Sequence, residues 1–232
     1  MNIIDIIIFL IMSVSFIFGM YNGLVLSTLH TVSFFLAWIS SLLLYPTLTN
    51  TLLDKFPKLL SAVTHYTEGN AQIPTVEERM TKISAITLDK LTEILEKIQL
   101  PNPFSRILLS DFSQNIEGVQ TLGEYFDSTM AITVVNIFSF LLLFILIEII
   151  FIVIISIGKT VVELPVLKKY DSLAGGGSGI VVGIFIVYLV FALVPIVIVL
   201  APVDLIKEFL DGSKLADFFL NSNIFSNFVK GR

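Results

Sequence analysis

The sequence has no cysteine and few charged side chains. The absence of cysteine excludes a disulfide framework and thiolate chemistry. Charged residues make up 14% of the chain and hydrophobic residues 55%, whereas an ordinary soluble domain has roughly 25% charged residues. This composition argues against a soluble enzyme. The net charge of −5 also gives no basic surface for nucleic acid, so we expect no nucleic-acid partner.

Charges are absent from windows long enough to cross a membrane. None lies between Asp5 and Asp54 or between Asp171 and Asp204, and the run 131–157 contains a single charged residue, Glu148. Because about 20 apolar residues cross a bilayer as a helix, the first window is long enough for two crossings. Two glycines and an asparagine in the segment 19–23 favour a tight turn there.

The predicted fold class is therefore an all-α integral membrane protein with four transmembrane helices. The first pair forms a hairpin and is followed by a water-soluble helical insert. The second pair forms another hairpin and is followed by an amphipathic C-terminal tail. The predicted boundaries are 1–45 for the first hairpin (spans 3–18 and 24–44), 46–130 for the insert, 131–202 for the second hairpin (spans 131–157 and 175–201) and 203–232 for the tail.

The insert and the tail show helical periodicity. From Pro74 to Leu100, apolar residues recur every three or four positions with charged residues between them, which predicts one amphipathic helix. The tail from Asp204 mixes apolar and charged residues in a similar way, and we expect it to cover the apolar face of the insert.

The distribution of lysine predicts the orientation. The short loop 158–174 carries Lys159, Lys168 and Lys169, while the basic residues of the opposite side are spread over much more chain. Since short basic loops stay in the cytoplasm, we expect a multi-pass protein of the cell membrane with the insert and both termini extracytoplasmic.

Small residues recur four apart in two spans. Gly175, Gly179 and Gly183 form one such face, and Ser15, Gly19 and Gly23 form another. Small residues allow two helices in a membrane to approach closely. Packing inside one bundle is the favoured interpretation, and a homo-oligomer interface is the alternative.

The segment Glu163–Gly183, which reads ELPVLKKYDSLAGGGSGIVVG, resembles the colicin V production protein (CvpA) family, Gram-positive type. The resemblance lies in Leu164-Pro165, Leu167-Lys168, Asp171 and the glycines four apart, and Asp5 and Gly23 also fit it. Ser172 stands where the family usually has arginine. The resemblance implies a four-span, non-enzymatic membrane factor for toxin production or export.

Patterns typical of catalytic or metal sites are weak. Gly176-Gly177-Ser178-Gly179 fits the serine motif of rhomboid proteases, but His30 precedes the serine and only four spans are expected. His65 and Glu68 lie one helical turn apart and could both bind a metal ion, but two residues are too few ligands for a zinc site. We therefore predict no catalytic residue, no metal and no cofactor.

Glu148 is the residue whose chemistry most needs an explanation. An ionised carboxylate near mid-bilayer costs several kcal/mol unless it is paired, hydrated or protonated. It could exchange protons or bind a cation, or it could be a neutral side chain hydrogen-bonded to Asn136, His30 or a serine across the bundle. Asp5 lies near a span end, where water can reach it.

Two functional hypotheses follow. The first is a membrane factor that supports toxin (colicin or bacteriocin) production or export through assembly with itself or with secretion or envelope proteins. The second is a small channel or a proton- or ion-coupled transporter that uses Glu148. The candidate polar site comprises Glu148, Asp5 and His30, and the candidate packing and family residues are Gly23, Pro165, Asp171, Gly175, Gly179 and Gly183.

Overall fold

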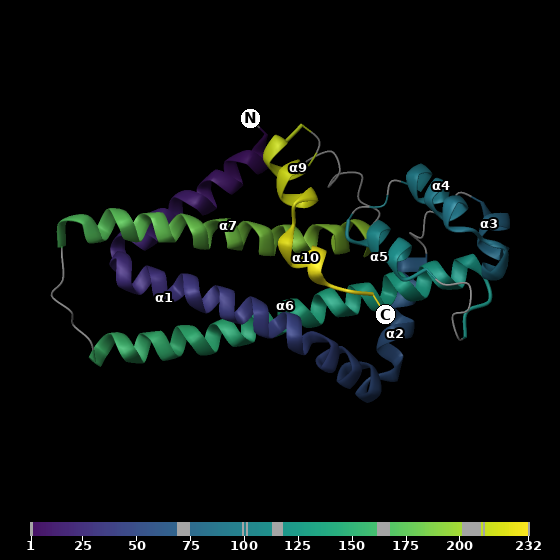
Figure 1. The fold of residues 1–232 in the computed structure, drawn as a ribbon, viewed down its shortest axis with the longest axis horizontal. Helices are drawn as coiled ribbons and strands as arrows, with labels where there is room; N and C mark the ends of the chain where they lie inside the picture. Colours follow the sequence, from purple (N-terminus) through teal and green to yellow (C-terminus); the bar gives the residue numbers. More distant parts are fainter. Residues whose placement is uncertain are drawn as a thin grey trace. The chain divides into compact units, whose positions relative to one another are not determined.

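The computed structural model describes residues 2–68, 75–98, 100, 102–112, 118–161, 168–200, 210 and 212–231. Over these residues the chain is helical, apart from loops and one isolated bridge between Lys82 and Thr121. The helices, labelled in Figure 1, are α1 (Ile3–Lys55), α2 (Pro57–Glu68), α3 (Val76–Met80), the 3-10 turn η1 (Ile83–Ala85), α4 (Leu88–Ile98), α5 (Phe104–Ser110), α6 (Leu122–Val161), α7 (Lys168–Leu200), α9 (Lys214–Asn221) and α10 (Ile224–Phe228).

Helix α1 consists of two helical segments that meet at Gly23. This glycine has φ 76° and ψ 174°, a non-helical conformation that side-chain-bearing residues rarely adopt. In Figure 1 the purple helix α1 turns back on itself. The turn was expected within 19–23, and the structure narrows it to Gly23, with Gly19 still in helix. The second segment continues past Pro46 to Lys55.

Three of the described helices are long and apolar enough to cross a membrane: Ile3–Lys55, Leu122–Ile157 and Asp171–Ile198. Helices hydrophobic on all sides are typical of membrane spans. The chain is therefore an all-α membrane protein with several spanning helices.

The chain forms two compact units. The first comprises Met1–Tyr45, Phe140–Phe191 and Leu205–Phe225, and the second comprises Pro46–Ser139, Ala192–Asp204 and Ser226–Arg232. The first unit contains the break of α1 and the parts of α6 and α7 that fall within Phe140–Phe191. An aromatic cluster is buried inside it, in which Phe144 contacts both Phe34 and Phe225 at ring-centroid distances of 5.3 and 5.6 Å.

The prediction of one helix from Pro74 to Leu100 is wrong. The structure has α3, η1 and α4 there, and Val76 and Met80 on α3 are exposed. The reason is a backbone pairing that competes with helix formation. The N–H of Ile83 donates to the carbonyl of Gln120 at 3.0 Å, and the N–H of Leu122 donates to the carbonyl of Thr81 at 2.9 Å.

The second unit buries the apolar face of α4. Its buried residues are Leu91, Ile94, Leu95 and Ile98. Arg79 pairs with Asp127 of α6, and the Tyr125 hydroxyl donates to the carbonyl of Leu108 at 2.6 Å. The insert residues of this unit therefore form a packed helical layer.

The start of the predicted tail, 203–209, lies outside the described residues. The described tail residues before Ser226 belong to the first unit and not to the unit that contains the insert. Phe225 is fully buried in the first unit among aromatic rings, and the Asn223 side chain donates to the backbone carbonyl of Tyr188 at 2.9 Å. The last residues belong to the second unit, where Asn136 donates to the carbonyls of Lys230 and Gly231. This last part contacts the insert, where the Arg106 side chain donates to the carbonyl of Val229.

Candidate functional site

Glu148 projects from α6 into the interior of the first unit. It is 6% exposed, and its Oε1 lies 2.9 Å from the Ser33 hydroxyl on the second segment of α1. Its Oε2 is buried and has no hydrogen-bond partner among the described residues. A buried carboxyl oxygen without a partner is costly, and it marks the group as a candidate for binding a proton or a cation.

Ser33 can serve both protonation states of this acid. Its Oγ lies 2.8 Å from the carbonyl of His30 as well as 2.9 Å from Glu148. A hydroxyl has one proton and can also accept, whereas a carbonyl can only accept. Ser33 can donate a hydrogen bond to an ionised Glu148, or it can donate to the His30 carbonyl and accept a hydrogen bond from the O–H of a neutral Glu148. The local geometry is therefore compatible with gain and loss of a proton.

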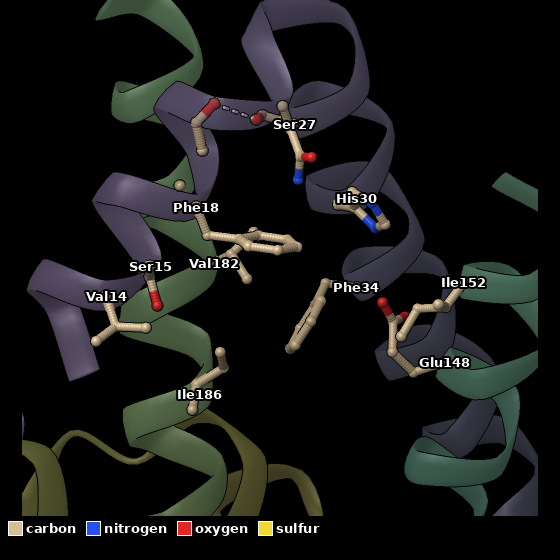
Figure 2. A pocket seen from close by; sticks show the side chains of 13 residues that line it. Val14, Ser15, Phe18, Ser27, His30, Phe34, Glu148, Ile152, Val182 and Ile186 are labelled. Carbon is tan, nitrogen blue, oxygen red and sulfur yellow. Dashed lines mark hydrogen bonds between the residues drawn. The ribbon is translucent and has the colours of Figure 1, made fainter. Parts of the chain in front are cut away.

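A pocket of about 300 Å³ adjoins the carboxyl group. Figure 2 shows Phe18, His30 and Glu148 directed toward one space from the first segment of α1, the second segment of α1 and α6. Phe34 stands between the pocket and the aromatic cluster, since it lines the pocket and also contacts Phe144. The lining residues are Val14, Ser15, Phe18, Gly19, Asn22, Ser27, His30, Phe34, Glu148, Ile152, Gly179, Val182 and Ile186.

The glycines of α7 hold one wall of this pocket in place. A Cβ on Gly179 would overlap the Ser15 carbonyl and lie 3.0 Å from the Gly19 Cα. A Cβ on Gly175 would lie 2.5 Å from the Gly19 carbonyl oxygen, and one on Gly183 would lie 3.0 Å from the Ser15 Cβ. The two small-residue faces thus pack against each other within one chain, which brings the backbones of α1 and α7 into direct contact.

Asp171 caps the break in α1. Its Oδ1 accepts a hydrogen bond from the Leu24 N–H at 2.8 Å, and a Cβ on Gly23 would overlap its Oδ2. The adjacent Ser172 donates to the Met20 carbonyl at 3.0 Å, and Ser27 donates to the Gly19 carbonyl at 3.0 Å. These three side chains satisfy backbone groups that a helix break leaves without intrahelical partners.

Asp5 is not part of the Glu148 pocket lining. It accepts from the Asn2 N–H at 2.9 Å and from the Ser213 hydroxyl. Ser213 in turn accepts from the Ala216 N–H at 3.0 Å as the N-cap of α9. Asp5 therefore anchors the start of α9 to the N-terminal turn of α1.

The remaining candidates include the serine and the histidine of the rhomboid-like motif. The Ser178 hydroxyl lies 3.5 Å from the Thr28 hydroxyl, whereas the His30 side chain lines the Glu148 pocket. Pro165 lies outside the described residues. Within the described part of the chain, no group of three or more His, Cys, Asp or Glu side chains could hold a metal ion.

Sequence reasoning missed Ser33 as the partner of Glu148 and missed Phe225 as a core residue. A serine was among the partners considered for Glu148, but the positions of the serines in the spans gave no means of choosing among them. Phe225 lies in the tail, which was expected to cover the insert, so its place in the aromatic cluster of the first unit was not predicted.

A comparison with protein families matches the description Colicin V production protein over residues 4–72 and 115–223. The chain belongs to the colicin V production protein family. The matched region of this family member includes Glu148, Ser33, Asp171 and the glycine repeat of α7, while the residues between the two matched stretches fall in the insert. No curated protein and no solved structure matches the chain.

Proposed function

We propose that this family member is a four-span protein of the cytoplasmic membrane, in which the two segments of α1 each cross the bilayer. The insert and both termini are extracytoplasmic, and the turn at Gly23 and the connection between α6 and α7 are cytoplasmic. Support comes from the break at Gly23, which divides a helix of 53 residues, and from the lysines beside the α6–α7 connection, Lys159, Lys168 and Lys169. The glycine repeat and Leu164-Pro165 favour the Gram-positive type of the family.

The biological role we propose is support of toxin production or export without covalent catalysis. The observation that carries it is the family match over most of the chain. The test is a toxin-producing strain in which the gene is deleted. Secreted toxin falls after deletion and returns with the intact chain. Unchanged secretion in the deletion strain would contradict this role.

The molecular activity that the geometry supports best is transport of a proton or a small cation through the Glu148 pocket. Assembly through the glycine faces has less support, because those faces already pack against each other inside one chain. The single observation favouring transport is the buried, unpartnered Oε2 of Glu148 beside a cavity. Intramembrane acids of this kind commonly mark ion and proton pathways.

Flux in liposomes tests the transport proposal. Protein is reconstituted with a pH dye inside the vesicles, and acid is added outside. Glu148→Gln keeps the shape of the side chain but cannot ionise, so the acidification rate falls at least tenfold. Glu93→Gln, a matched change at an exposed insert residue, leaves the rate unchanged. No flux above that of empty vesicles, or equal rates for the two variants, would refute transport.

Toxin secretion separates the two activities in cells. If transport is the activity, Glu148→Gln fails to restore secretion in the deletion strain. If assembly is the activity, Glu148→Gln restores secretion and Gly179→Leu does not.

A further inference from the structure

The Glu148 pocket combines one acid with mainly apolar walls. Its apolar lining residues are Val14, Phe18, Phe34, Ile152, Val182 and Ile186. The polar groups that share the lining are Ser15, Asn22, Ser27 and His30. Ligand sites with apolar walls and a few converging polar groups typically bind molecules that are themselves largely apolar.

This composition does not suit a bare metal ion. Magnesium and calcium take six or more oxygen ligands, and the pocket offers one carboxyl group among hydrocarbon walls. A protonated amine instead brings its own apolar body, and its N–H groups can donate to a carboxylate. The buried Oε2 is an acceptor available for such a donor.

The volume sets the size of the ligand. An engineered protein cavity of about 150 Å³ binds benzene, and this pocket measures about 300 Å³. Because the pocket has about twice the volume of the benzene cavity, it can accommodate a compact molecule of about a dozen heavy atoms.

Part of the pocket lining lies on the apolar outer surface. Three lining residues are strongly exposed, namely Val14 at 58%, Phe18 at 60% and Ile152 at 46%. They lie on the first segment of α1 and on α6, two of the helices that are long and apolar enough to cross a membrane. The opening between them therefore faces lipid, so a ligand that partitions into the bilayer can enter from the side.

We propose that this pocket binds lipophilic amines, as monovalent organic cations that enter from the bilayer and pair with Glu148 Oε2. A proton and an ammonium group compete for the same oxygen, so binding of the amine to the neutral acid releases a proton. The inference deepens the transport proposal by naming its ligand class and rests on the same pocket.

The test is binding of radiolabelled 1-adamantanamine, a compact amine of suitable size, to the full chain in lipid nanodiscs. Empty nanodiscs measure partition of the amine into lipid. We expect saturable binding of one amine per chain. Glu148→Gln weakens it at least tenfold, Glu93→Gln leaves it unchanged, and the uncharged isostere 1-adamantanol competes at least tenfold more weakly than the amine.

A second pair of variants tests the lateral entry. Ile152→Phe narrows the lipid-facing mouth and weakens binding several-fold, whereas Ile154→Phe, at a similarly exposed position of α6 outside the lining, does not. The proposal is overturned by binding no greater than that of empty nanodiscs, by equal affinity of wild type and Glu148→Gln, or by equal competition from the alcohol. Amine binding without flux would contradict the transport proposal and leave this inference standing. Glu148-dependent proton flux without amine binding would contradict this inference and leave the transport proposal standing.

Discussion

The carboxylate of Asp171 accepts a hydrogen bond from the backbone N–H of Leu24, 2.8 Å away, at the point where α1 breaks. The two residues are 147 positions apart in the sequence. One side chain of α7 therefore caps the second segment of α1, and the turn that reverses the chain depends on a long-range contact.

Replacing Asp171 tests this cap. Asp171→Ala removes the acceptor for Leu24 and is expected to cost about 1 kcal/mol of stability, while Asp171→Asn retains an acceptor and costs less. Thermal unfolding in detergent, followed by the fluorescence of the single tryptophan, Trp38, measures both. Equal losses for the two variants would show that the Asp171 hydrogen bond does not stabilise the break.

Two glycines of α7 form a matched pair for testing the contact with α1. Gly179→Ala pushes a methyl group into the Ser15 backbone, and the resulting overpacking costs about 1–3 kcal/mol. Gly177→Ala meets nothing within 4 Å, so it leaves stability unchanged or raises it by up to about 1 kcal/mol through helix propensity. The same unfolding measurement applies, and equal effects of the two changes would contradict the packing.

The tail should contribute strongly to the stability of the first unit. Phe225→Ala removes a fully buried ring from the aromatic cluster and is expected to cost about 3–5 kcal/mol. Phe228 is 57% exposed, so Phe228→Ala serves as the control and is expected to cost much less. Comparable stability of Phe225→Ala and wild type in detergent would mean that the tail does not pack as described.

Topology can be tested with reporter fusions. Fusions after Gln99 and after Arg232 should report an extracytoplasmic position, and a fusion after Lys169 should report a cytoplasmic one. An alkaline phosphatase and a green fluorescent protein reporter at each site give opposite signals, so each result is checked twice. Finding the Gln99 and Arg232 fusions on opposite sides would refute an even number of crossings between them.

Much of the fold follows from the sequence because lipid imposes strong rules. The charge-free windows predicted the apolar helices, and two glycines predicted a turn where Gly23 now has a positive φ. The same patterns could not reveal that Thr81 and Ile83 pair with the chain just before α6. Helical periodicity shows which residues are apolar, but it does not show whether a backbone group will form a hydrogen bond with another segment instead of within a helix.

The candidate site was predictable only in part. Glu148 stood out because a lone acid in an apolar run is rare. Its partner Ser33, the cavity beside it and the burial of Phe225 depend on how helices distant in sequence meet. Sequence spacing alone does not determine the register in which those helices meet.

The central claim is that Glu148, whose Oε2 has no hydrogen-bond partner among the described residues, lines a pocket reached from lipid. Its most direct test is labelling of the protein in native membranes with the hydrophobic reagent dicyclohexylcarbodiimide, followed by mass spectrometry of the fragments. We expect modification at Glu148 that is lost in Glu148→Gln and slowed by Ile152→Phe. Absence of modification at Glu148, while acids of the exposed insert react, would contradict it.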